Sequence, residues 1–338
     1  MSDQTFSAET RERIDAYLTA SGLALRRPRV VPLTGDASDR RYFRVLLDPA
    51  ESVVLALHTG PIVFATMPFA TVGSLLRRMD IPAPTVLGYS DPLGIIALQD
   101  LGDVTLQAHV GTASVTAHTA LYREAVALIH QLQTQGRQFA VAGTVPYTIA
   151  FDVEKLTWEL NYFAKYFLAG YRGISLSTSE HAVLTDEWAQ MANDLAAERR
   201  VVCHRDYHSR NLMVHDGRLY MIDFQDARLG PDTYDLASLL RDSYVDISER
   251  ERDDLVTYFL TLSRIDDLVE FRRRFDYMSL QRNIKALGTF GFQASARAIT
   301  TYIQYMPRTL QAVRENLTKH DRFARLHDLL AVHVEELR

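Results

Sequence analysis

Residues 203–224 read CHRDYHSRNLMVHDGRLYMIDF, and this stretch decides the fold. Its pattern predicts a short strand, then a loop that carries Asp206 and Asn211, and then a hairpin. The hairpin is predicted to turn at the Asp-Gly pair in its middle, a dipeptide typical of tight turns. Because a hairpin reverses the chain, we expect Asp223 at its far end to lie beside Asn211.

Three oxygen-bearing side chains in this order suit phosphoryl transfer. A carboxylate at Asp206 can orient an attacking hydroxyl and accept its proton. The amide oxygen of Asn211 and the carboxylate of Asp223 can hold Mg²⁺ against phosphates, because hard cations prefer oxygen ligands. We therefore treat Asp206 as the candidate catalytic base, and Asn211 and Asp223 as the candidate metal ligands.

Three motifs follow one another in this part of the chain. The pattern H-x-D-x-x-x-x-N spans residues 204–211, I-D-F spans 222–224, and GPDTYDLA spans 230–237. Together they resemble the aminoglycoside phosphotransferase/choline kinase superfamily, and the resemblance covers most of the chain. Within that superfamily, further segments resemble the bacterial anomeric kinases of N-acetylmuramate and N-acetylglucosamine: GDASDRRYFRV (35–45), IPAPTVLGY (81–89), LQDLGDVTL (98–106) and LQRNIKALGTFGFQ (280–293).

The residue pattern changes near residue 100. The first hundred residues contain short β-rich segments and turns, whereas the remainder is mostly helical in pattern. The resemblance implies an α+β, protein-kinase-like fold with a small antiparallel β-rich N-lobe at 1–100 and a larger, mostly helical C-lobe at 101–338. In the C-lobe, helices are predicted over 115–134, 150–169, 179–199, 233–244, 247–262, 265–293 and 319–335.

The resemblance also implies a reaction. Phosphate would pass from ATP, with Mg²⁺, to the anomeric hydroxyl of the two amino sugars, giving the α-1-phosphates used in peptidoglycan recycling. The residues themselves leave other small acceptors open, namely an aminoglycoside, choline or another sugar. A different class of function is a nucleotide-binding pseudokinase or accessory protein, although the intact set of Asp206, Asn211 and Asp223 favours an enzyme.

Carried over by position, the resemblance implies roles for further residues. His204 and Asp235 are expected to brace the loop that holds Asp206. A covering loop and a hinge are expected to bind the nucleotide through Gly35, Asp36, Ala37, Ser38, Arg41, Arg44, Gln99, Asp100 and Leu101. Substrate contacts are predicted, each against a structural alternative, for His208, Arg210, Asp226, Trp158 and Arg282.

The alternatives differ from residue to residue. Trp158 shares a helical face with two tyrosines, so it belongs either to a sugar-stacking platform or to the core. Arg282 and Lys285, three residues apart on a helix, either hold the carboxylate of N-acetylmuramate or form a solvated basic face. Arg210 meets phosphate or solvent, and Asp226 lies near the metal or at the surface.

One departure from ordinary kinases concerns charge. Their third strand carries a lysine that grips the phosphates of ATP and pairs with a glutamate. Here residues 53–58 contain no lysine, the first lysine of the chain is Lys155, and no glutamate lies between Glu51 and Glu124. Another cation must take this role, and arginine suits it because its planar fork matches phosphate oxygens. The nearest candidates are Arg40, Arg41 and Arg44.

Composition bounds the remaining possibilities. The chain has 338 residues, 47% of them hydrophobic, and a net charge of −5. This balance argues against a nucleic-acid partner bound by bulk positive charge. The single cysteine rules out an internal disulfide, and no apolar run is long enough to span a membrane. We expect a cytoplasmic protein whose partner is a small amino sugar, and the sequence leaves protein partners open.

Overall fold

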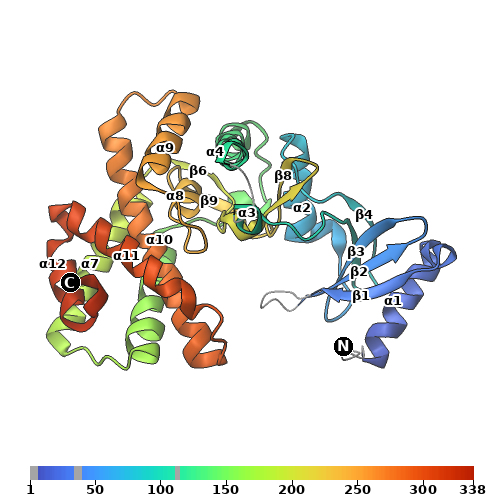
Figure 1. Ribbon diagram of the computed structural model, residues 1–338, viewed down its shortest axis with the longest axis horizontal. Helices are drawn as coiled ribbons and strands as arrows, with labels where there is room; N and C mark the ends of the chain where they lie inside the picture. The colour runs from blue at the N-terminus through green and yellow to red at the C-terminus, as the bar shows by residue number, and fades with distance from the viewer. Residues whose placement is uncertain (1–6, 34–39, 111–114) are drawn as a thin grey trace.

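The computed structural model covers the full chain and describes residues 7–33, 40–110 and 115–338. Its N-terminal part is a five-stranded antiparallel sheet in the order β1-β2-β3-β5-β4 (Figure 1). Strand β2 pairs with β3 so that Arg44 lies opposite Val54. The strands are β1 (Arg29–Leu33), β2 (Arg41–Leu47), β3 (Glu51–Leu57), β4 (Val86–Ser90) and β5 (Ile95–Gln99).

Each face of this sheet carries an apolar cluster of its own. Helix α1 (Ala8–Ala20) covers one face, where it buries Ile14 against Phe43 and Leu55. The opposite face carries a smaller cluster formed by Ala56, Ile96 and Leu98. Successive strand residues point to opposite faces, so β3 contributes to both clusters.

Helix α2 (Pro68–Arg78) follows the sheet's first three strands but packs on the C-terminal core. Its buried residues Val72, Leu75 and Leu76 join the large hydrophobic cluster of the helical part. The ring of Phe69 stacks on Phe224 at a centroid distance of 5.0 Å. This helix therefore joins the sheet to the segment that carries Asp223.

The rest of the chain is mainly helical (Figure 1). Two short antiparallel pairs interrupt the helices: β6 (Arg200–Cys203) pairs with β9 (Arg228–Pro231), and β7 (Leu212–His215) with β8 (Arg218–Met221). The helices are α3 (Leu106–Val110), α4 (Val115–Gln138), α5 (Val145–Thr148), α6 (Val153–Tyr162), α7 (Thr178–Ala196), α8 (Tyr234–Leu240), α9 (Glu249–Ser263), α10 (Leu268–Arg297), α11 (Met306–Lys319) and α12 (Ala324–His333).

Among the elements that were not predicted are the short helices α3 and α5, helix α11 and strand β9. No helix was predicted between 294 and 318, where α11 lies, although its first turn holds Pro307 and its buried residues Leu310, Val313 and Leu317 recur at helical spacing. Strand β9 was not predicted, because only its pairing with β6 makes four residues a strand.

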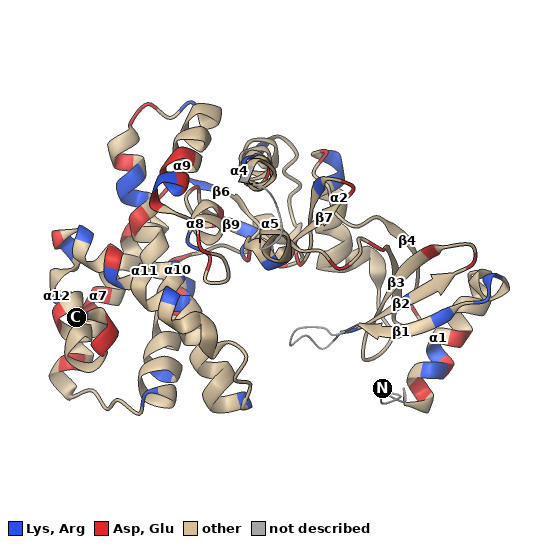
Figure 2. Ribbon diagram, in the orientation of Figure 1, with Lys and Arg blue, Asp and Glu red and all other residues tan. Residues whose placement is uncertain are grey.

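Charged side chains are spread over both parts of the molecule. Figure 2 shows basic and acidic residues interspersed along α1 and along the helices of the C-terminal part. Within the described ranges, no helix combines the length and the apolar character needed to cross a membrane.

Helix α10 crosses a π-helical segment (Phe163–Tyr171), which continues α6, at very close range. A Cβ atom at Gly291 would lie 2.5 Å from the carbonyl oxygen of Tyr166, and one at Gly288 would lie 2.7 Å from the backbone nitrogen of Phe163. Only glycine permits this approach, so the two glycines set the position of α10.

This contact makes a stability prediction. We expect Gly291→Ala to lower the free energy of unfolding by about 1–3 kcal/mol, the usual cost of overpacking. The loss should appear in urea titrations even though alanine favours a helix by up to about 1 kcal/mol. Gly60→Ala is the matched control, because a Cβ atom there meets nothing within 4 Å. Equal stability of the two variants would contradict the prediction.

Candidate active site

The loop that carries Asp206 is held from its backbone. Asp235, in the first turn of α8, accepts hydrogen bonds from the backbone N–H groups of His204 (2.6 Å) and Arg205 (3.1 Å). The His204 ring lies with Nε2 2.9 Å from the carbonyl oxygen of Ile222. Arg205 has a φ of 87°, a strained value for a non-glycine residue, and the Asp235 carboxylate stabilises it. Both predicted bracing residues thus contact this loop.

Asn211 and Asp223 come together as the hairpin predicts. The Asn211 Nδ2 group donates to the backbone oxygen of Asp206 at 2.9 Å, which leaves the amide oxygen Oδ1 for another partner. The Ile222 N–H group donates to the Asn211 carbonyl at 3.0 Å, so Asp223 follows directly beside it. The Asp223 carboxylate is half exposed and accepts from Gln225 Nε2 at 2.8 Å.

Three cations surround the Asp206 carboxylate. Lys285 Nζ lies 3.0 Å from Oδ1, Arg205 Nε lies 3.6 Å from Oδ2, and an Arg282 nitrogen lies 3.9 Å from Oδ1. Burial by itself would raise the pKa of Asp206. The charges of Lys285, Arg205 and Arg282 outweigh it and hold this pKa well below the usual range. Asp206 is therefore ionised at neutral pH.

Lys285 was not predicted as a partner of Asp206. It comes from α10, 79 residues further along the chain, and it is largely buried. Burial lowers its pKa, while the charge of Asp206 raises it. The only local signal was its spacing from Arg282, and that spacing does not say which way α10 faces.

Asp206, Asn211 and Asp223 line one cavity of about 450 Å³. Part of its lining is aromatic, and the rings of Trp158 and Tyr162 there lie at a centroid distance of 5.1 Å. Trp158 is 53% exposed, whereas Phe163 and Phe167 nearby are fully buried. Phe163 and Phe167 therefore belong to the hydrophobic core, whereas Trp158 does not.

Two further predicted residues also line this cavity. His208 is partly buried, and its ring meets Tyr244 edge-on at a centroid distance of 5.2 Å. Burial lowers the pKa of His208 to about 3, so the ring is neutral at neutral pH. The Arg210 guanidinium lies 4.9 Å from the centre of the same Tyr244 ring. Both side chains are packed against an aromatic residue at the cavity wall.

Arg282 and Asp226 are both engaged by other groups of the protein. Arg282 donates to the hydroxyl of Tyr234 (2.7 Å) and to Ser238 (2.8 Å), and it is only 8% exposed. Arg282 also lines the cavity and lies 3.9 Å from the Asp206 carboxylate, so its contact with a substrate carboxylate stays a prediction. Asp226 pairs with Arg205 at 2.8 Å and does not line the cavity.

The predicted nucleotide-binding residues separate into three groups. Gly35, Asp36, Ala37 and Ser38 lie outside the described residues. Gln99 ends β5 and accepts from the Thr85 N–H group at 3.3 Å, and Leu101 is buried just beyond it. The hinge residues therefore connect the sheet directly to the segment that precedes α3.

The three candidate arginines point in different directions. Arg44 binds Asp100 at 2.6 Å and Asp103 at 2.8 Å, so it ties β2 to the segment after β5. Arg41 donates to Thr10 of α1 at 3.0 Å. Groups of the protein already engage both side chains, which makes them weaker candidates for phosphate binding than Arg40. Arg40 instead lies 3.8 Å from the Asp223 carboxylate, at the candidate metal position.

Comparison with known proteins agrees with this geometry. The model of the phosphotransferase enzyme family matches residues 29–272. An N-acetylmuramate/N-acetylglucosamine kinase of Neisseria meningitidis serogroup B is 33% identical over 302 residues, which cover 87% of this chain and 87% of that protein. A kinase of the same name from Pseudomonas aeruginosa is 29% identical over 314 residues, covering 89% of this chain and 88% of that one.

Solved structures share the fold at lower identity. A choline/ethanolamine kinase family protein from Mesorhizobium loti superposes with a TM-score of 0.61 at 16% identity, over 96% of this chain and 99% of that one. The amicoumacin kinase hAmiN, solved with AMP-PNP and Ca²⁺, superposes with a TM-score of 0.59 at 13% identity, over 95% and 100%. With the family model and the kinase relatives spanning most of its length, this chain belongs to the phosphotransferase enzyme family and is a kinase.

Proposed function

We propose that this kinase transfers the γ-phosphoryl group of ATP, with Mg²⁺, to the anomeric hydroxyl of N-acetylmuramate and N-acetylglucosamine, giving their α-1-phosphates. The observation that carries the proposal is the single cavity of about 450 Å³ that Asp206, Asn211 and Asp223 share with the Trp158 and Tyr162 rings. That volume suits one monosaccharide. The naming of the two relatives supports the choice of sugar.

Asp206 acts as the base in this reaction. Its carboxylate orients the anomeric hydroxyl and takes the proton as the new O–P bond forms and the bond to ADP breaks. Three neighbouring cations make it a weak base, because they hold its pKa low. An anomeric hydroxyl is more acidic than an ordinary alcohol, so this acceptor matches a weak base.

Lys285 supplies charge at the same place. Its ammonium group is 3.0 Å from Asp206 and lines the cavity, so it faces the position that the transferring phosphoryl group must occupy. The negative charge on that group is stabilised by fixed cations in a site sheltered from water. Lys285 thus takes over part of the role of the lysine that β3 lacks.

The residues fit a magnesium ion. The Asn211 amide uses its nitrogen, not its oxygen, in the hydrogen bond to Asp206, and Asp223 offers a half-exposed carboxylate in the same cavity. Mg²⁺ is commonly held by one or two such side chains together with substrate phosphates. In the described ranges, no group of three His, Cys, Asp or Glu residues could bind a metal unaided. When bound, the ion would neutralise phosphate charge.

We assign the nucleotide to the junction of two lobes, residues 1–100 and 101–338. The sheet ends at Gln99, and Arg44 clamps Asp100 and Asp103 beyond it. The apolar cluster around Ala56 and Leu98 would cover the adenine from the sheet side. Arg40 would contact the phosphates from the same lobe.

The assignment of Arg40 makes a kinetic prediction. We expect Arg40→Ala to raise the KM for ATP by roughly tenfold or more, the usual loss for a charged hydrogen bond. Arg41→Ala is the matched control, because Arg41 contacts Thr10 on the outer side of the sheet. An unchanged KM for ATP in Arg40→Ala would remove Arg40 from the nucleotide site.

The function is tested by ATP turnover with N-acetylmuramate, N-acetylglucosamine, glucose, choline and kanamycin. ADP release and loss of the sugar's reducing end are followed together, with and without a chelator of Mg²⁺. We expect turnover only with the N-acetyl sugars, with one reducing end lost per ADP and no activity in the chelator. ADP release without loss of the reducing end would place the phosphate on another hydroxyl and refute the anomeric proposal.

A further inference from the structure

The last turn of α10 brings two further polar side chains to the candidate active-site cavity. Gln293 and Arg297 stand at positions i and i+4 of this helix, so they share one face of it, and both line the cavity. Lys285, which contacts Asp206, lies earlier on the same helix and also lines the cavity. The cavity therefore extends along α10 from the catalytic carboxylate to the end of the helix.

Arg297 carries a charge that no carboxylate of the described residues matches. Its guanidinium lies 5.3 Å from the centre of the Phe292 ring, which lines the same cavity, and it forms no ion pair in the described ranges. Burial raises the pKa of Tyr162, and the charge of Arg297 opposes this rise, so the guanidinium lies close enough to act on that hydroxyl group. The side chain thus folds back from the helix end toward the aromatic lining.

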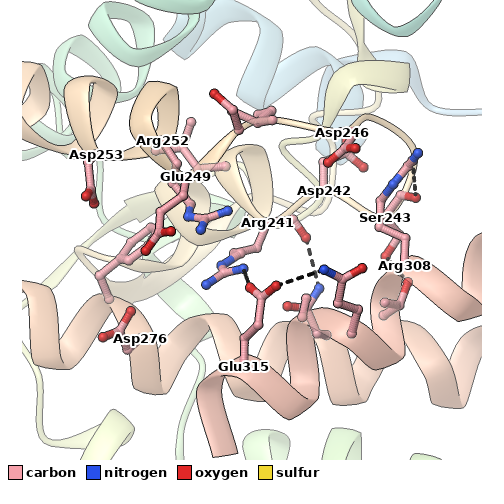
Figure 3. Close-up of a pocket in the computed structure, with 18 of the residues that line it drawn as sticks. Arg241, Asp242, Ser243, Asp246, Glu249, Arg252, Asp253, Asp276, Arg308 and Glu315 are labelled. Atoms are coloured by element: carbon pink, nitrogen blue, oxygen red, sulfur yellow. Dashed lines mark hydrogen bonds and ion pairs between the residues drawn. The ribbon is translucent and has the colours of Figure 1, made fainter. Parts of the chain in front are cut away.

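The other basic side chains of the cavity already have partners within the protein. Arg241 faces an adjoining cavity of about 550 Å³, where it binds Glu315 at 2.7 Å (Figure 3). The rest are Lys285 on Asp206, Arg205 on Asp226, Arg282 on Tyr234 and Arg210 on the Tyr244 ring. Among the residues that the structure describes, Arg297 is therefore the cation of this cavity that is left for a ligand.

Gln293 offers a neutral group one helical turn before Arg297. Its side chain is 8% exposed, and its amide oxygen is buried without a hydrogen-bond partner among the described residues. A buried acceptor without a partner is costly, so a ligand N–H group that donates to it is favoured. The two residues together present a hydrogen-bond acceptor and, beside it, a cation.

We propose that Arg297 binds the lactyl carboxylate of N-acetylmuramate and so distinguishes the two amino sugars. Both sugars carry an acetamido group on C2, whose N–H group would donate to Gln293. Only N-acetylmuramate carries a lactyl group, on the neighbouring carbon C3, and a guanidinium presents a planar fork to its carboxylate. Neighbouring positions on the sugar ring thus match neighbouring positions on the helix. The inference rests on the proposed function for the identity of the acceptor.

Calorimetric titration of the full-length protein with each sugar, in the presence of AMP-PNP and Mg²⁺, tests this inference. We expect Arg297→Gln to weaken the binding of N-acetylmuramate by about tenfold or more, the usual loss for a charged hydrogen bond, and to leave the binding of N-acetylglucosamine almost unchanged. Arg297→Lys should retain part of the preference. Gln293→Leu should weaken both sugars by a similar factor, because both carry the acetamido group.

Lys165→Gln is the matched control for charge. Lys165 is an exposed cation on the ring of Tyr166, which itself contacts Phe292, but it does not line the cavity. This variant should bind both sugars like the wild type. The same selective loss in Lys165→Gln would show that charge outside the cavity is sufficient, and it would overturn the assignment to Arg297.

Other results would also overturn the inference. They are no binding of N-acetylmuramate by the wild type, and an equal loss or no loss for the two sugars in Arg297→Gln, which would leave Arg282 as the candidate for the carboxylate. Unchanged binding in Gln293→Leu would remove Gln293 from the acetamido group. Because titration measures binding, a wild type that binds both sugars without turning them over would refute the proposed function and still allow Arg297 to be judged.

Discussion

Replacing Asp206 with asparagine is expected to lower kcat by roughly 10²- to 10⁴-fold, the usual contribution of a positioned general base. The substitution keeps the shape of the side chain but removes the group that accepts the acceptor's proton. The surrounding backbone bonds from Asp235 hold the loop from the main chain, so the fold should persist. The measurement is steady-state turnover with saturating ATP and N-acetylglucosamine.

Two controls separate the loss of a base from the loss of a fold. Asp226→Asn changes a nearby carboxylate that pairs with Arg205 outside the cavity, and it should retain most of the activity. Asp206→Asn should still bind ATP with an affinity close to that of the wild type. Activity of Asp206→Asn within a few-fold of the wild type would mean that the base lies elsewhere.

Replacing Lys285 with methionine is expected to have the second-largest effect. We expect kcat to fall by roughly 10²-fold, the scale found when one electrostatic contact to a transition state is removed. Methionine has a similar length and can pack in the same place, so the loss reflects the missing charge of Lys285. Lys285→Arg should recover part of the activity, since it restores a cation near Asp206.

The pH profile gives a readout that a merely structural role would not change. Lys285 is the first of the charges that lower the pKa of Asp206, so its removal raises that pKa. The acid limb of kcat/KM should therefore move to higher pH in Lys285→Met and return toward its original position in Lys285→Arg. If kcat falls and the acid limb stays in place, Lys285 does not act through Asp206.

Local patterns were sufficient for the parts of the fold whose contacts are local. The hairpin that joins Asn211 to Asp223 was predicted from two alternating segments and an Asp-Gly turn, and it forms as β7 and β8. Its register follows from the turn itself, so the relative position of the two candidate ligands needed no tertiary information. Residues that are close in sequence constrain one another strongly.

Contacts between distant residues had no such local signal. Arg44 pairs with Asp100, which is 56 residues away in sequence, because β2 lies against the segment that follows β5. Similarly, Lys285 reaches Asp206 because α10 sits against the π-helical segment, and glycines at 288 and 291 set that distance. Spacing on a helix predicted that Arg282 and Lys285 share a side, but not that both line the cavity beside Asp206.

The placement of lysine has a consequence for chemical labelling. A nucleotide whose terminal phosphate carries a reactive acyl group transfers that group to a nearby lysine amine. In kinases with a lysine on the third strand, the mark falls in the N-terminal lobe. In this chain the first lysine is Lys155, and Lys285 is the lysine that lines the cavity with Asp206, Asn211 and Asp223. The label should therefore fall on the peptide containing Lys285, and a survey that searches only for N-terminal labelled peptides would overlook this enzyme.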